Sequence, residues 1–318
     1  MSRKRHKTDD MKRLIKRVVI VLASAGFLLP LSSSAQTGAF DAMRPVGRET
    51  FEMMRGFFDY DRGVPLDVKI AGTTDWEGYV REKVVFSGVD PDSRVPGYLA
   101  VPQEGTAPYP CVFLIHGLNS SKESWWQFGG PMNELTRQLL AAGFAVMTLD
   151  TEYHGERLAN NGFESPRSFA EKGWYTHFRD MVIQSVIEYR RALDYLTTRP
   201  EIDAGRIGVV GYSMGGTMAF NLTAMEPRIR TSVACVTPVS AAPMQPTAVQ
   251  NSAPYITRQP FLMLMADKDE MNYTIQQAQR LYEMLATPTK DLVVFDSGHM
   301  LPREWVDPAM EWMQKYLK

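Results

Sequence analysis

Cysteine is scarce in this sequence, whose 318 residues include only Cys111 and Cys235. Two cysteines are too few for a disulfide framework or for a structural zinc site. An excess of charge of one sign is also missing, because 35 Lys and Arg residues face 36 Asp and Glu residues. This balance gives no support for a nucleic-acid-binding protein, which needs a basic face. A composition that is 44% hydrophobic and 22% charged excludes disordered and collagen-like chains.

Short motifs of several other function classes are absent. The sequence has no H-E-x-x-H motif, and its histidines lie far apart, so we expect no metal site. It has neither the G-x-x-x-x-G-K nor the G-x-G-x-x-G pattern, so we expect no nucleotide cofactor. Internal repeats and low-complexity tracts are missing too. The expectation is a globular protein that works without a cofactor.

The N-terminus combines a basic stretch with an apolar one. Residues 1–35 contain eight Lys and Arg residues but only two acids, and an apolar run from Val18 to Leu31 precedes Ser33-Ser34-Ala35. This order predicts a secretory signal peptide that is cleaved near Ala35. The alternative is a retained membrane anchor, but the run is shorter than the roughly 20 residues of a spanning helix. We therefore expect a secreted or periplasmic protein with no stable membrane span after cleavage.

The rest of the chain divides into an extension, residues 36–75, and one domain, residues 76–318. In the extension, one helix is expected near residues 48–58. In the domain, expected strands alternate with helices, and most of the strands are continuous apolar runs. The strands are expected at 79–86, 97–101, 111–115, 144–149, 206–210, 231–236, 261–265 and 292–295, and the main helices at 132–142, 175–198, 216–225 and 308–317. This alternation predicts a single α/β domain, with a mostly parallel sheet and helices on both faces.

The strongest chemical signal is a G-x-S-x-G pattern, Gly211–Gly215, with Ser213 at its centre. It stands directly between an expected buried strand and an expected helix, which is the setting of a nucleophile elbow. In such a turn the glycines avoid collisions with neighbouring backbone, and the serine hydroxyl projects above the sheet edge. The alternative, an ordinary tight turn, is disfavoured by this setting and by Gly216.

A serine hydroxyl needs a base that takes its proton and an acid that orients the base. In this architecture the acid and then the histidine follow the serine along the chain. His299 follows the last expected strand and is the one histidine after Ser213, so we assign it as the base. Asp267, Asp269 and Glu270 all lie between Ser213 and His299, and chain order does not choose among them.

An oxyanion hole needs backbone N–H groups that point at the developing negative charge. One is expected from Met214, the residue after the nucleophile. The other is expected from Leu118, in the His116–Asn119 loop that follows the apolar strand at 111–115. The imidazole of His116 is expected to hold this loop rather than to react, because the base is assigned elsewhere.

These motifs together resemble the α/β-hydrolase superfamily, especially its dienelactone-hydrolase-like and acetyl-xylan-esterase-like branch. The resemblance covers roughly residues 78–318. It is carried by Ile115–Glu123 (I-H-G-L-N-S-S-K-E), Tyr153–Arg157 (Y-H-G-E-R), Arg199–Asp203 (R-P-E-I-D), Gly211–Gly216 (G-Y-S-M-G-G) and Ser297–His299 (S-G-H). It implies an eight-stranded sheet and ester hydrolysis through an acyl-enzyme. The sequence departs from dienelactone hydrolases in having Ser, not Cys, as the nucleophile, which disfavours dienelactone as the substrate.

The resemblance also bears on the acid. Related sequences commonly place it nine residues after the proline that opens the preceding strand, here Pro260, and this favours Asp269. Asp267 is the alternative, followed by Glu270. The expected triad is therefore Ser213, Asp269 and His299.

The expected function is that of a serine esterase acting on a small ester or an acylated polymer. One alternative is a prolyl-oligopeptidase-like serine peptidase, but such enzymes usually carry a β-propeller that residues 36–75 are too few to build. The other is a catalytically inactive binding protein on the same fold, which would normally lack a triad member. The acyl group, the alcohol and the oligomeric state are not visible in the sequence.

Several weaker features have two interpretations. His154 and Arg157 contact substrate or hold a turn, and the turn is favoured. Five aromatic residues line a substrate pocket or belong to the core: Trp125, Trp126, Phe128, Trp174 and Tyr175. In the superfamily's strand order one strand separates Cys111 from Cys235, so their backbones lie roughly 9–10 Å apart. A disulfide needs Cα atoms within about 7 Å, so we expect two free buried thiols.

Overall fold

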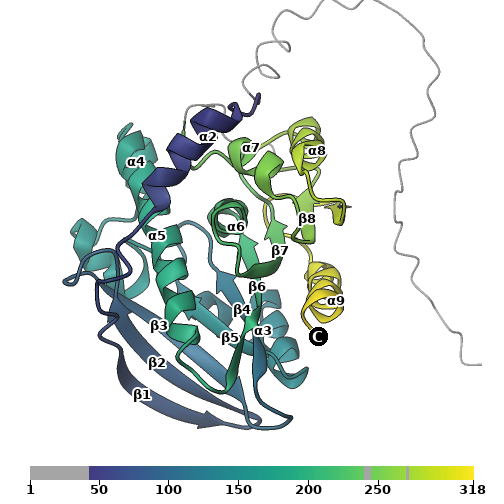
Figure 1. Cartoon of the computed structure of the whole chain (residues 1–318). Coiled ribbons are helices and arrows are strands. Elements are labelled where there is room, and N and C mark those ends of the chain that lie inside the picture. Colours follow the sequence, from purple (N-terminus) through teal and green to yellow (C-terminus); the bar gives the residue numbers. More distant parts are fainter. Residues whose placement is uncertain (1–42, 240–244, 270–271) are drawn as a thin grey trace, which may run out of the picture. The chain divides into compact units, whose positions relative to one another are not determined.

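A single sheet runs through the described residues, in the strand order β1-β2-β3-β5-β4-β6-β7-β8-β9 (Figure 1). The computed structural model describes residues 43–239, 245–269 and 272–318. The strands are β1 (Lys69–Trp76), β2 (Tyr79–Ser87), β3 (Arg94–Pro102), β4 (Tyr109–Ile115), β5 (Ala145–Leu149), β6 (Ile202–Tyr212), β7 (Ile229–Cys235), β8 (Phe261–Ala266) and β9 (Lys290–Phe295). β5, β4 and β6 to β9 are mutually parallel, whereas β1, β2 and β3 pair antiparallel. The predicted mostly parallel α/β fold is confirmed.

The number of strands differs from the prediction. Eight were expected, and the described chain has nine. The additional strand is β1, which lies in the segment interpreted as an extension and pairs antiparallel with β2, from Lys69 against Val85 to Trp76 against Tyr79. Every residue of β1 is exposed, so this edge strand is held by backbone hydrogen bonds and has no buried face. Hydrophobic alternation therefore gave no sign of it.

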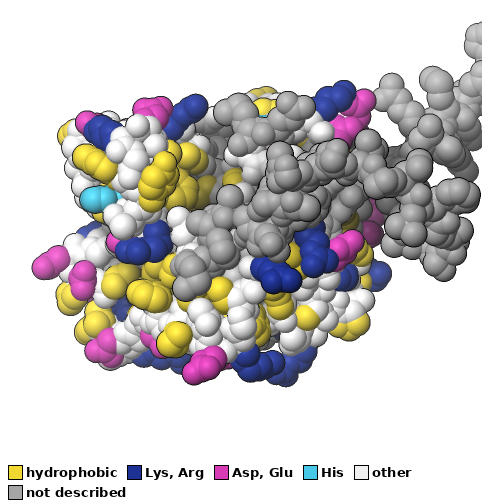
Figure 2. Space-filling view, turned by 90° about the horizontal axis from the view of Figure 1, so that it is seen from above, with side chains coloured by type: hydrophobic (Ala, Val, Ile, Leu, Met, Phe, Trp, Pro, Cys, Tyr) yellow, Lys and Arg dark blue, Asp and Glu magenta, His cyan; other side chains and the backbone are white. Residues whose placement is uncertain are grey.

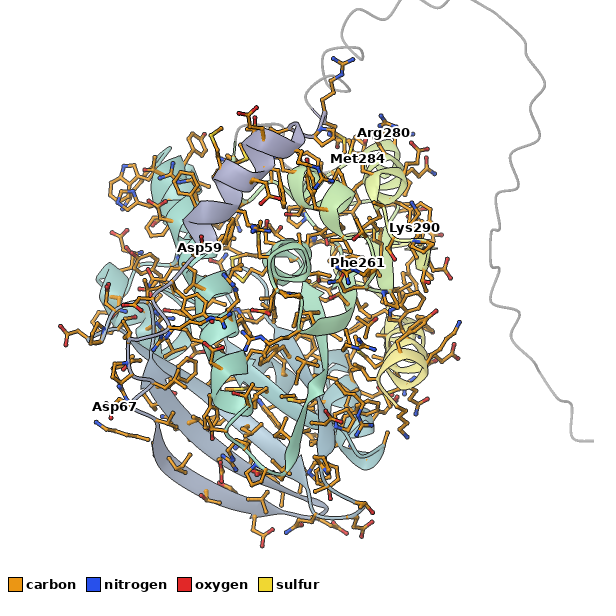
Figure 3. The ribbon with its side chains drawn as sticks, viewed as in Figure 1. Asp59, Asp67, Phe261, Arg280, Met284 and Lys290 are labelled. Atoms are coloured by element: carbon orange, nitrogen blue, oxygen red, sulfur yellow. The ribbon has the colours of Figure 1, made fainter. Side chains whose placement is uncertain are left out.

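Helices cover both faces of the sheet. They are α2 (Arg48–Arg55), α3 (Pro131–Ala141), α4 (Arg167–Glu171), α5 (Tyr175–Leu196), α6 (Met214–Met225), α7 (Val249–Ser252), α8 (Ile275–Met284) and α9 (Val306–Leu317), with short 3₁₀ helices at Gly56–Phe58, Lys122–Trp125, Gly155–Asn161, Ala253–Tyr255 and Arg303–Trp305. α3 packs against α9 on one face, and α5 packs against α6 on the other. At the start of β8, Phe261 packs against Phe220 of α6 with ring centroids 4.5 Å apart (Figure 3).

The segment from α2 to β1, which includes Asp59 and Asp67, is anchored to the domain (Figure 3). Two arginines of α5 donate to its carbonyl oxygens: Arg190 to Phe58 at 2.7 Å, and Arg191 to Val64 at 3.1 Å. The ring of Phe51 in α2 stacks on Tyr255, with centroids 3.7 Å apart. The helix predicted near residues 48–58 is present as α2 and the 3₁₀ turn after it. The predicted signal peptide, residues 1–35, lies outside the described residues.

The two cysteines are free and buried, as predicted. Cys111 lies on β4 and Cys235 on β7, and β6 runs between these strands. Burial raises the pKa of both thiols well above the ordinary range, so neither is a nucleophile at neutral pH. In the part of the chain that the structure describes, no helix combines the length and the apolar character needed to cross a membrane.

Candidate active site

A sharp turn joins β6 to α6 and carries Ser213 at its tip. The backbone of Ser213 has φ +57° and ψ −116°, a conformation that L residues rarely adopt. Its neighbours lie too close to other backbone for a side chain. A Cβ on Gly211 would stand 2.0 Å from the carbonyl oxygen of Gly215, and one on Gly215 would stand 2.2 Å from that of Ile115 in β4. The turn thus has the geometry of a nucleophile elbow, for the steric reason that the sequence pattern suggested.

Three side chains from separate loops meet at this turn. The Oγ atom of Ser213 lies 2.9 Å from Nε2 of His299, and Oδ2 of Asp269 lies 2.6 Å from Nδ1 of the same ring. Asp269 is buried, whereas Ser213 and His299 are half-buried and face the mouth of the site. With its proton on Nδ1 donated to Asp269, the imidazole presents Nε2 as an acceptor for the serine hydroxyl.

The other two candidate acids are placed differently. Asp267 is exposed, and its Oδ1 accepts a hydrogen bond from the backbone N–H of Ser297 at 3.2 Å. Glu270 lies outside the described residues. Of the two described carboxylates, Asp269 is the one within hydrogen-bond distance of His299.

Two residues that support His299 were not found by sequence reasoning. The side-chain amide of Asn272 donates to Oδ1 of Asp269 at 2.8 Å, which turns the other carboxylate oxygen toward His299. The hydroxyl of Tyr212 donates to the carbonyl of His299 and accepts from the N–H of Leu301, both at 2.9 Å. Tyr212 stands inside the elbow motif, but no pattern in the sequence pairs it with the histidine loop.

The loop after β4 faces the nucleophile. A Cβ on Gly117 would lie 3.3 Å from Cβ of Ser213, so the two backbones nearly touch. Within the described part of the chain, the backbone N–H groups of Leu118 and Met214 have no protein acceptor. Met214 also opens α6, and the N-terminus of a helix favours negative charge. Of the predicted oxyanion donors, Leu118 therefore stands on the loop after β4, and Met214 is the first residue of α6, directly after Ser213.

His116 and His154 are buried behind this loop, with ring centroids 5.0 Å apart. Nδ1 of His116 lies 2.8 Å from the carbonyl of Gly117, and its Nε2 accepts from the N–H of Thr151 at 3.3 Å. Nδ1 of His154 lies 2.8 Å from the carbonyl of Glu152. Burial lowers the pKa of His116 to about 4 and that of His154 to about 2. Both rings are neutral at physiological pH. His116 ties the loop after β4 to the loop after β5 through Thr151, and His154 holds the loop after β5 through Thr151 and Glu152.

A buried carboxylate, Asp150, ties the same two loops together. Its Oδ1 accepts from the backbone N–H of Lys122 at 2.9 Å, and its Oδ2 accepts from the ammonium of Lys122 at 2.7 Å and from the N–H of Glu156 at 3.0 Å. Burial opposes the charge on Lys122, but Asp150 and Glu156 raise the pKa of the amine above its ordinary value. Arg157 is buried and pairs with Glu188 at 2.5 Å, so it holds the turn, as the sequence favoured.

The structure also shows where the five aromatic residues lie that the sequence assigned either to a substrate pocket or to the core. Trp125 is fully buried in the core. Trp126 packs 6.0 Å from Tyr98 of β3, and Phe128, 90% exposed, lines an open groove of about 780 Å³ beside α3. Trp174 and Tyr175 are exposed at the start of α5. In the described residues, no three His, Cys, Asp or Glu side chains are grouped so that they could hold a metal ion.

A family model described as the dienelactone hydrolase family matches residues 95–299. This stretch includes Leu118, the elbow, Asp269 and His299, and it is more than half of the chain. The chain belongs to the dienelactone hydrolase family. Its elbow carries Ser213, whereas cysteine is expected at this position in dienelactone hydrolases proper.

The curated relatives that the chain matches are longer proteins, and the match covers only part of each. The chain is 30% identical over 156 residues to the 2,6-dihydropseudooxynicotine hydrolase of Paenarthrobacter nicotinovorans, an overlap of 49% of this chain and 34% of that protein. It is 27% identical over 152 residues to the esterase FrsA of Serratia proteamaculans, an overlap of 48% and 30%. The matched region thus spans about a third of the length of these relatives.

Solved structures share the fold of this family member. Acetyl xylan esterase 1 from a Thermoanaerobacterium species matches with a TM-score of 0.67 at 18% identity, over 90% of this chain and 99% of that one. The dienelactone hydrolase of Anabaena variabilis matches with a TM-score of 0.55 at 20% identity, over 75% and 98%. At these identities the likeness is one of α/β-hydrolase fold.

The two buried histidines predict how stability depends on pH. Below the ordinary histidine pKa of about 6.5, both imidazoles bind a proton in the unfolded chain but stay neutral in the folded chain. As the pH is lowered from about 6.5 to 4, the free energy of unfolding should therefore decrease by up to about 1.4 kcal/mol per pH unit for each ring. In urea titrations over this range, His154→Asn, which keeps a donor near the Glu152 carbonyl, should show a shallower pH dependence than the parent. Equal slopes in the variant and the parent would contradict the prediction.

Proposed function

We propose that this protein is a serine esterase, which cleaves carboxylic esters through an acyl-enzyme intermediate. The observation that carries the proposal is the continuous hydrogen-bonded path from Ser213 through His299 to Asp269, with distances of 2.9 and 2.6 Å. Membership of the dienelactone hydrolase family and the esterase named among the relatives support the same reaction class.

In the first half of the reaction, Oγ of Ser213 attacks the ester carbonyl as its proton passes to Nε2 of His299. The carbonyl oxygen becomes an oxyanion, which the N–H groups of Leu118 and Met214 stabilise. Asp269 stabilises the imidazolium and fixes its orientation, and Asn272 keeps the carboxylate turned toward the ring. The carbon–oxygen bond to the alcohol then breaks, and the alcohol leaves with the proton from His299.

In the second half, water attacks the acyl group on Ser213. His299 takes a proton from this water and returns it to Oγ as the acyl–serine bond breaks, which releases the carboxylic acid. The path needs no metal ion or organic cofactor, since each proton moves among Ser213, His299, substrate and water.

Replacement of the nucleophile tests the reaction. Ser213→Ala should lower kcat on p-nitrophenyl acetate by at least about 10³-fold, because the acyl-enzyme cannot form. A fluorophosphonate probe should label the parent at Ser213 and leave the variant unlabelled, with melting temperatures that show both to be folded. Near-parental turnover by the variant would refute the mechanism. An unlabelled parent would favour an inactive binding protein, and faster cleavage of dipeptidyl amides than of esters would favour a peptidase.

The acid is tested by a matched pair. Asp269→Asn should lower kcat by roughly 10³ to 10⁴-fold, because the amide no longer stabilises the imidazolium. Asp267→Asn removes the same charge two residues away and keeps an oxygen that can accept from Ser297, so its kcat should stay within about twofold of the parent. A larger loss from Asp267→Asn would assign the acid to that position.

We further propose that the chain is exported, on the strength of the basic, apolar and small-residue order of residues 1–35. When the full chain is expressed in a bacterium that has a periplasm, osmotic shock should release an active protein whose first residue lies near Gln36. Deletion of Val18–Leu31 should leave the protein in the cytoplasm. An intact N-terminus on protein that stays with the membrane would instead indicate an anchor.

A further inference from the structure

The loop after β5 brings a group of aromatic side chains to the oxyanion loop. Near its start, the N–H of Thr151 donates to His116, the residue before Gly117. Further along, the hydroxyl of Ser165 is hydrogen-bonded to the side chain of Asn119, the neighbour of Leu118. The segment 151–177 is therefore attached to the oxyanion loop at two points. We call six of its ring-bearing side chains the aromatic wall, which excludes the buried ring of His154: Tyr153, Phe163, Phe169, Trp174, Tyr175 and His177.

The aromatic wall is built on one buried ring and is open to solvent. Phe169 is buried, and its centroid lies 5.4 Å from Tyr153, 5.6 Å from His177 and 6.4 Å from Trp174. Trp174, Tyr175 and Phe163 are 45%, 64% and 75% exposed. Figure 2 shows hydrophobic side chains gathered on the left of the upper face, the side on which Figure 1 places α4. Apolar surface that is gathered in this way marks binding sites more often than ordinary surface.

Backbone strain points to the same residues. Tyr153 and Phe163 have φ of +62° and +66°, which is unfavourable for bulky side chains. Of the other described non-glycine residues with positive φ, Asn119, Ser213 and Val236 lie on the loops after β4, β6 and β7, and Asp67 lies before β1. Such strain persists where the surrounding structure imposes it, and it collects at ligand-binding and catalytic sites. Two wall residues thus share this property with the nucleophile and the oxyanion loop.

The charges of the wall are balanced, which indicates an uncharged ligand. Lys172 pairs with Glu164 at 2.5 Å, Arg167 with Glu171 at 3.4 Å, and Arg179 with Asp180 at 2.7 Å. Nearby polar side chains are also engaged, since Ser165 bonds Asn119 and Asn161 donates to the carbonyl of Glu164. What the wall offers to a ligand is mainly the faces and edges of its rings, apart from the face of Trp174 over which the Lys172 ammonium lies, 4.7 Å from the ring centroid.

We propose that the aromatic wall is a substrate subsite, which binds an apolar aromatic or long alkyl group carried by the ester at a distance from the scissile bond. This inference rests on the proposed esterase function and adds the class of ester that it prefers. The subsite acts by burying apolar surface that both partners otherwise expose to water, so its contribution falls on substrate binding.

The test compares esters that reach the wall with one that is too short to do so. Hydrolysis of vinyl acetate, vinyl decanoate and 2-naphthylethyl acetate is followed by pH-stat for the parent and for the double variant Phe163→Ser/Trp174→Ser. The variant should raise KM about tenfold or more on vinyl decanoate or on the naphthylethyl ester, with kcat within about twofold, and should leave both constants for vinyl acetate unchanged. A change on the decanoate assigns the wall to the acyl side, and one on the naphthylethyl ester assigns it to the alcohol side.

The control is Phe128→Ser, which removes an aromatic ring that is even more exposed than those of Phe163 and Trp174 from the groove beside α3, and it should behave as the parent on all three esters. Parental constants for the double variant on both long esters would overturn the subsite, as would an equal loss on vinyl acetate. Acetylated xylan is assayed as a fourth substrate. If the double variant loses activity on this substrate alone, the wall stacks on sugar rings, and the apolar assignment is overturned. If the parent hydrolyses none of the esters, the proposed function fails instead, and that result is distinct from the others.

Discussion

The approach of α6 to β4 is the constraint on which the site depends. Gly215 lies so close to the carbonyl of Ile115 that no side chain fits between them, whereas a Cβ on Gly117 would make a tight contact of 3.3 Å with Cβ of Ser213. The end of β4, the elbow and the start of α6 are therefore fixed relative to one another by contact between backbones. The same packing that closes the core therefore also places Ser213 next to Gly117 and directly before the first residue of α6.

Electrostatics on the two sides of the nucleophile are arranged differently. Behind the oxyanion loop, Asp150, Lys122, Arg157 and Glu188 are buried and paired, and two neutral histidines fill the space beside them. A buried pair of this kind contributes little net stability, but the loss of one partner is costly, so the arrangement favours one loop geometry. On the side of the base, a single buried carboxylate, Asp269, faces the half-exposed ring of His299. The buried side thus holds the loop of the proposed oxyanion donor Leu118 in place, while the more open side leaves His299, the proposed base, partly exposed to solvent.

Features that depend on local pattern could be predicted from the sequence. Apolar strands such as 111–115 and 261–265 and the glycines around Ser213 follow from burial and sterics, and the position of His299 follows from chain order. Features that depend on pairing across the fold could not. β1 has no buried face, Asn272 reaches Asp269 through a local turn without a motif, and Tyr212 meets His299 across 87 positions of sequence. The choice of Asp269 came from resemblance to related sequences, since three neighbouring carboxylates are equivalent in chain order.

The separation of Cys111 and Cys235 by β6 has a consequence for how the protein reaches its structure. No covalent cross-link between them is geometrically available, so the native fold is specified by non-covalent interactions. Folding therefore does not depend on the redox state of the compartment in which it occurs. The native state is the same whether the chain folds in a reducing or in an oxidising environment. No thiol oxidase or disulfide isomerase is needed to reach it.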